Sequence, residues 1–87
     1  MKTKTRSIHE LLIVMRDNFD EYYEWGLCVL ANNLYAYDIY SYKELCILMR
    51  YINENRPNQE RGWSWTIGEK EPRKKWLDEQ IKLTNPK

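Results

Sequence analysis

The sequence predicts an all-α fold, a compact bundle of about four short helices with an ordered tryptophan-rich loop before the last helix. Three observations lead to this prediction. Apolar residues recur in several stretches at the three- and four-residue spacing of one helix face. Two Ser-x-x-Glu motifs, which begin at Ser7 and Ser41, have the form of capping boxes that open helices. The one stretch that alternates like a strand, residues 62–68, has no second strand to pair with.

We interpret residues 1–87 as a single domain, because a chain of this length has room for one hydrophobic core. Hydrophobic residues make up 43% of the chain and aromatic residues 14%, which favours a folded globule over a disordered chain. Residues 1–6 are a polar, basic lead-in that we expect to be frayed, and residues 84–87 form a tail.

The first helix begins after Ser7, where the hydroxyl accepts from the Glu10 amide and the Glu10 carboxylate accepts from the Ser7 amide. It extends to about Asp17, and Asn18 and Asp20 predict a bend after it. Its apolar face consists of Ile8, Leu11, Leu12, Met15 and Phe19.

A second helix is predicted from Glu21 to Ala36, with a buried stripe of Leu27, Leu30, Ala31 and Leu34. Gly26 lowers helix stability by about 1 kcal/mol relative to Ala. It therefore marks either the true start of this helix or a point of close helix contact.

The third helix, residues 42–55, follows the second capping box and has the clearest periodicity, with Leu45, Leu48, Met49 and Ile52 on one face. We expect it to be central in the bundle.

Pro72 occupies the first position of the last helix, whose apolar face is Trp76, Leu77 and Ile81. The loop between these helices is expected to bury one or both of its tryptophans.

Charge and cysteine content limit the function classes. The formal net charge of +1 provides no overall field for nucleic acid, and acidic neighbours dilute the basic residues 70–75. The apolar run that follows the basic N-terminus, residues 11–15, is too short for a signal peptide or a membrane span. Cys28 and Cys46 lie within apolar helical patterns, so we expect buried, free thiols in a reducing compartment. The sequence thus favours a cytoplasmic protein that binds neither membrane nor nucleic acid.

The segments Asn55-Arg56-Pro57 and Gly62-Trp63-Ser64-Trp65-Thr66-Ile67-Gly68-Glu69-Lys70-Glu71-Pro72-Arg73 resemble a group of small uncharacterised proteins encoded in bacteriophage and prophage genomes. Thr66 and Glu69 depart from that pattern, which often has proline and aspartate at these positions. The resemblance implies a phage accessory protein within a host bacterial cell, without a mechanism. Small phage proteins often act against host immunity, either by capping a defence protein or by sequestering its nucleotide signal.

We do not expect an enzyme. The single histidine, His9, has no catalytic partner at a recognisable spacing, since general-base catalysis needs a positioned neighbour. No phosphate-binding glycine loop or metal-ligand cluster is visible, so no cofactor is predicted.

The predicted ligand-binding residues are Trp63, Trp65 and Arg73, with Arg56 and Arg61 beside them. Indole rings stack on a base, while a guanidinium and the free N–H groups of a helix start bind phosphate. This combination suits a nucleotide-like anion. In the alternative interpretation the tryptophans only close one end of the bundle, and Arg73 pairs with Glu69 or Asp78.

A second hypothesis is direct binding to a host defence protein, because Trp, Tyr and Arg are common interface anchors. A tyrosine-rich surface of this kind could also be buried between copies of the chain in a homo-oligomer. Its expected members are Tyr22, Tyr23, Trp25, Tyr35, Tyr37 and Tyr40.

Overall fold

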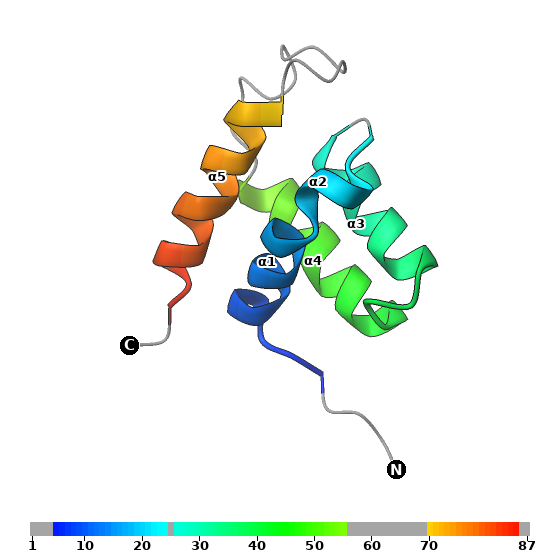
Figure 1. Ribbon diagram of the computed structural model, residues 1–87. Helices are drawn as coiled ribbons and strands as arrows, with labels where there is room; N and C mark the ends of the chain where they lie inside the picture. Colours follow the sequence, from blue (N-terminus) through cyan, green and yellow to red (C-terminus); the bar gives the residue numbers. More distant parts are fainter. Residues whose placement is uncertain (1–4, 25, 56–69, 86–87) are drawn as a thin grey trace.

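The computed structural model describes residues 5–24, 26–55 and 70–85. Within these ranges it contains five α-helices and no strand (Figure 1). The helices are α1 (Ile8–Asp17), α2 (Phe19–Tyr22), α3 (Leu27–Ala36), α4 (Tyr42–Asn55) and α5 (Lys70–Leu83). The predicted all-α class is confirmed. The predicted tryptophan-rich loop lies outside the described residues.

Helix α1 is the centre of the arrangement, because it packs against each of the other four helices. Figure 1 shows α5 on one side of α1 and α3 on the other, with α4 crossing behind. Leu11, Leu12 and Met15 of α1 are all 0% exposed. The prediction that helix 42–55 would be central was wrong. Apolar residues on two adjoining faces of α1 meet neighbours on several sides, whereas α4 packs chiefly on α1 and α3.

The predicted start and end of the first helix are confirmed. The Glu10 amide donates to Ser7 Oγ at 3.2 Å, and the Ser7 amide donates to Glu10 Oε1 at 3.0 Å. At the other end, Asn18 Nδ2 donates to the Val14 carbonyl at 2.8 Å. The asparagine thus satisfies a carbonyl of the last turn where the chain bends into α2.

The predicted helix over residues 21–36 is instead two helices, α2 and α3. The chain leaves the helical conformation at Tyr23, whose φ of −68° and ψ of 136° are extended. Tyr23 turns its ring onto that of Phe19, with the centroids 4.7 Å apart. The Gly26 carbonyl accepts from the Leu30 amide at 2.9 Å, so Gly26 marks the start of α3.

Helix α5 begins at Lys70, two residues before the proline that was expected to open it. Pro72 is compatible with the third helical position, because an N–H in the first turn has no acceptor within the helix. Trp76 and Leu77 are buried as predicted, and Ile81 is half-buried. Tyr51 of α4 reaches this helix and donates to Gln80 Oε1 at 2.6 Å.

Neither cysteine is in a disulfide, and both are less buried than predicted. Cys28 is half-buried and Cys46 is exposed. Cys46 lies one helical turn from both Tyr42 and Arg50, which are exposed as well, so this row of α4 faces outward.

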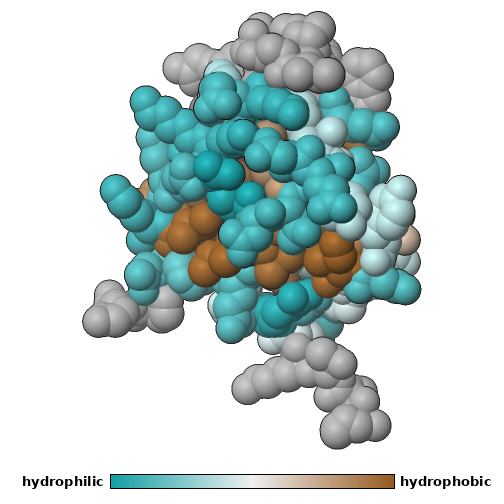
Figure 2. Space-filling view, in the orientation of Figure 1, coloured by the Kyte–Doolittle hydropathy of each residue, from teal (hydrophilic) through white to brown (hydrophobic). Residues whose placement is uncertain are grey.

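The surface is mixed in character. Figure 2 shows mainly hydrophilic residues on one face, with hydrophobic residues emerging in a row across its lower half. Ile8 and Ile81 pack against the core while staying partly exposed, and Leu83 is 75% exposed. The core is therefore incompletely covered by polar side chains.

The second capping box is confirmed, and it has an additional partner. The Ser41 amide donates to Glu44 Oε1 at 3.0 Å, while the Glu44 amide donates to Ser41 Oγ at 3.1 Å. Arg6 also donates to both Glu44 carboxylate oxygens at 3.0 Å and to the Ile39 carbonyl at 2.7 Å. Arg6 is thus held against α4, although we expected it to be frayed. The hydrogen bond from Arg6 lowers the pKa of Glu44 to about 2.

Replacing Glu44 by Gln should lower the free energy of unfolding by about 2 kcal/mol at neutral pH, the scale of hydrogen bonds to a charged group. Gln keeps an oxygen for the capping box, so the change isolates the ion pair. The folded-state pKa is depressed, so the contribution is complete above the ordinary pKa of 4.5 and is lost as pH falls toward 2. Urea denaturation should therefore show the difference from the wild type shrinking across that interval.

Glu10→Gln is the matched control, since Glu10 has the same place in the first capping box. It should cost less stability at neutral pH. Equal losses in the two variants would contradict a stabilising role for the contact between Arg6 and Glu44.

Candidate functional site

Four of the five predicted ligand-binding residues, Arg56, Arg61, Trp63 and Trp65, lie outside the described residues. The fifth, Arg73, lies on α5 and is 0% exposed. Its guanidinium carbon is 6.0 Å from the centroid of the Tyr23 ring. As placed, Arg73 therefore presents no atom to a ligand at the surface. Its role in binding stays a prediction.

Basic side chains of α5 contact the aromatic residues at and after α2. Lys70 Nζ is 6.0 Å from the Tyr23 centroid, and Lys74 Nζ is 5.6 Å from that of Phe19. Cations near aromatic ring faces are attracted by the ring quadrupole. These contacts give the basic cluster of residues 70–75 a structural role in joining α5 to α2.

Arg73→Ala should lower the free energy of unfolding by about 2–4 kcal/mol, because it removes a fully buried side chain and leaves its surroundings unfilled. Lys75→Ala, two residues along and exposed, should change it by no more than about 0.5 kcal/mol. Chemical denaturation of both variants provides the test. An unchanged stability in Arg73→Ala would show that this arginine is dispensable for packing.

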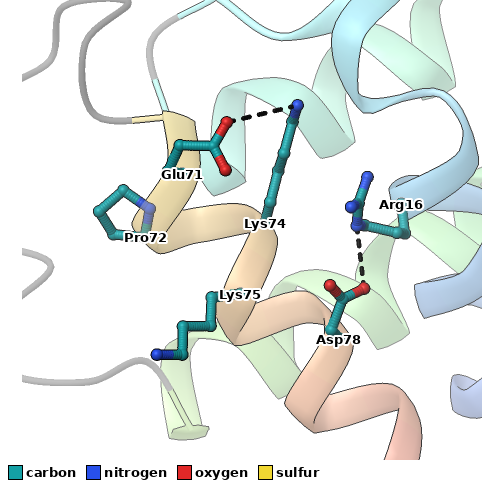
Figure 3. Close-up of a pocket in the computed structure, with 6 residues that line it drawn as sticks. All are labelled: Arg16, Glu71, Pro72, Lys74, Lys75 and Asp78. Carbon is teal, nitrogen blue, oxygen red and sulfur yellow. Dashed lines mark hydrogen bonds and ion pairs between the residues drawn. The ribbon is translucent and has the colours of Figure 1, made fainter.

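A hollow of about 500 Å³ opens between α1 and the first half of α5 (Figure 3). It is lined by Arg16, Glu71, Pro72, Lys74, Lys75 and Asp78. Three of these side chains are cationic and two are anionic. Figure 3 shows that Arg16 turns toward Asp78 across the hollow, while Lys75 extends away from α1.

Ion pairs surround this hollow, and one of them joins its two walls. Arg16 Nε donates to Asp78 Oδ1 at 2.9 Å. Lys74 Nζ lies 2.8 Å from Asp20 Oδ1 and 3.8 Å from Glu71 Oε2. The hydrogen bond from Lys74 lowers the pKa of Asp20. The Arg16–Asp78 pair crosses the hollow, whereas Lys74 pairs with Asp20 of α2 and with Glu71 of its own helix. The lining has one more cationic than anionic side chain, so an anion whose oxygens replace a carboxylate is compatible with it.

Sequence reasoning did not find this hollow. Asp78 was considered as a partner for Arg73, but it bonds to Arg16 instead. Asp20 was interpreted as part of the bend after the first helix. Arg16 and Asp78 are 62 residues apart, and neither local periodicity nor spacing carries a signal for such a pair. The basic cluster of residues 70–75 was the one available indication.

His9 lies against the end of the last helix. Its Nδ1 lies 3.2 Å from Thr84 Oγ1, a contact that links the start of α1 to the end of α5. Among residues 5–24, 26–55 and 70–85, no group of three or more His, Cys, Asp or Glu could hold a metal ion.

The described helices include none with the length and apolar character needed to cross a bilayer. Comparison with known proteins found no matching family model, no matching curated protein and no matching solved structure. The candidate site is therefore argued from its own geometry.

Proposed function

We propose that the protein is a small non-enzymatic binding protein that holds a compact, nucleotide-like anion in the hollow between α1 and α5. The observation that supports this proposal most directly is that three cationic side chains from two helices, Arg16, Lys74 and Lys75, line one hollow of about 500 Å³. Ligand sites commonly have volumes of about 300–1,000 Å³.

The ion pairs around the hollow do not prevent binding. The side chains of Arg16 and Asp78 are 33% and 57% exposed, and pairs this exposed are worth roughly 0–1 kcal/mol. A phosphate can replace such a carboxylate at little cost. Arginine also offers a planar fork that donates two parallel hydrogen bonds to phosphate oxygens. The exchange would leave the anion held between α1 and α5.

The aromatic part of the proposal rests on the sequence. Trp63 and Trp65 would stack on a base, with Arg56 and Arg61 near the phosphate, and these four lie outside the described residues. Their segment directly precedes α5, whose second residue, Glu71, lines the hollow. Counter-defence by sequestering a nucleotide signal is the cellular role that the resemblance to phage proteins favours.

A panel of linear and cyclic nucleotides tests the proposal by thermal denaturation. A ligand at ten times its dissociation constant adds about 1.4 kcal/mol to stability. For a domain of this size, that raises the melting temperature by roughly 5–10 °C. Lys75→Glu should abolish the increase, because the reversed charge repels phosphate at the edge of the hollow.

Lys43→Glu is the matched control: Lys43 is an exposed lysine of α4 outside the hollow. This variant should keep the full increase in melting temperature. If no nucleotide raises the melting temperature of the wild type, sequestration is wrong. Equal responses in the two variants would place binding elsewhere on the protein.

The alternative function is direct inhibition of a host protein, and exposed tyrosines favour it. Tyr35, Tyr37 and Tyr42 are 39%, 66% and 66% exposed. The rings of Tyr35 and Tyr42 meet edge to face, with their centroids 5.9 Å apart. Tyrosine gives large contact area at low entropic cost, which makes such a surface suited to a protein partner.

Co-purification from host cells distinguishes the two functions. A host protein bound through the tyrosines should be retained by the wild type and by Lys75→Glu. It should be lost from a Tyr35→Ser, Tyr42→Ser double variant, because that change removes the exposed aromatic area of α3 and α4. Retention by the tyrosine variant would contradict this interface.

A further inference from the structure

A second hollow, of about 150 Å³, lies where α2 and the end of α3 meet. We call it the acidic pocket. It is lined by Glu21, Tyr22, Tyr23, Glu24, Asn33 and Tyr37. It shares no lining residue with the anion hollow, so the two are distinct.

The walls of the acidic pocket are fixed by contacts between α2 and α3. Asn33 Nδ2 donates to the Tyr22 carbonyl at 2.9 Å, which ties the last residue of α2 to α3. The Tyr37 amide donates to the Asn33 carbonyl at 3.0 Å. The rings of Tyr22 and Tyr37 contact each other, with centroids 5.1 Å apart. Two aromatic rings are thereby held side by side beside a small polar space.

The electrostatics of the acidic pocket favour a cation. Glu21 and Glu24 are exposed carboxylates, and none of the six described lining residues is Lys or Arg. The carbonyl end of α3, which terminates at Ala36, adds partial negative charge nearby. Aromatic ring faces attract cations as well. The two carboxylates, the aromatic rings and the end of α3 therefore all attract positive charge to the acidic pocket.

Tyr23, which is itself one of the lining residues, shows that this part of the chain accepts cations. Its ring already has Lys70 and Arg73 of α5 at 6.0 Å. Tyr22 and Tyr37 instead pair with each other, and Tyr37 is 66% exposed. The exposed Tyr37 ring is thus available to a cation from solvent, as the Tyr23 ring is to the cations of α5.

We infer that the acidic pocket binds the side chain of an arginine presented by a partner protein. The volume of about 150 Å³ admits one side-chain head group and is too small for a drug-sized ligand. A guanidinium is planar and weakly hydrated, so it stacks on aromatic rings while its N–H groups donate to a carboxylate. A lysine ammonium is more strongly hydrated and lacks the planar face, so it fits this wall less well.

The test is an NMR titration of the full-length protein with short glycine peptides that carry one central residue, either arginine or citrulline. Citrulline has nearly the same shape without the charge. The arginine peptide should shift the side-chain amide signals of Asn33 and the ring signals of Tyr37, and the citrulline peptide should not. Spermidine, a free polyamine, is titrated as a third ligand.

Glu21→Gln combined with Glu24→Gln should raise the dissociation constant of the arginine peptide by about tenfold, because it removes both carboxylates and keeps their shape. Asp38→Asn is the control, since Asp38 is an exposed acid next to Tyr37 that does not line the pocket. Its φ of 66° is one that Asn tolerates. This variant should bind the peptide as the wild type does.

Three results would overturn the inference. The first is equal shifts from the citrulline and arginine peptides. The second is binding of spermidine at least as tight as that of the arginine peptide, which would assign the pocket to a free polyamine. The third is an equal loss of affinity in the Asp38→Asn control, which would indicate general charge attraction. Nucleotide binding at the hollow between α1 and α5 is measured in a separate experiment, and its result does not affect the conclusion about the acidic pocket.

Discussion

The burial of the apolar residues of α1 is the constraint on which the other elements depend. Leu11, Leu12 and Met15 lie wholly inside, and every other helix packs against α1. A domain of this size has only one core to stabilise it. Helix α5 also depends on this core. Its outward residues are largely charged, so its stability comes from Trp76 and Leu77, which pack inward.

The candidate anion hollow also results from the packing of helices against α1. Arg16 and Lys74 line one space because α1 and α5 lie side by side. The pair between Arg16 and Asp78 joins the two walls, and Lys74 pairs with Asp20 of α2. A ligand that competes with Asp78 for Arg16 would therefore weaken one link between the helices while adding its own. Binding and stability are linked through these exposed pairs, each of which is individually weak.

Local features of the sequence predicted local structure well. The capping boxes at Ser7 and Ser41 identified where α1 and α4 begin, since the signal and the structure involve residues three apart. The break after α2 depends on Tyr23 stacking on Phe19, which helical periodicity does not reveal. The long-range contacts, Arg16 with Asp78 among them, depend on how helices pack. Of the predicted site, the described residues include only Arg73, and it is buried against Tyr23.

The outward position of Cys46 has a practical consequence. Its thiol is accessible to maleimide reagents, whereas that of Cys28 is half-buried. A fluorophore attached there would sit on α4, away from the residues that line both hollows. The same accessibility allows two copies of the chain to be cross-linked by a disulfide through oxidation. A reductant is therefore needed during purification to distinguish such a cross-link from a non-covalent dimer.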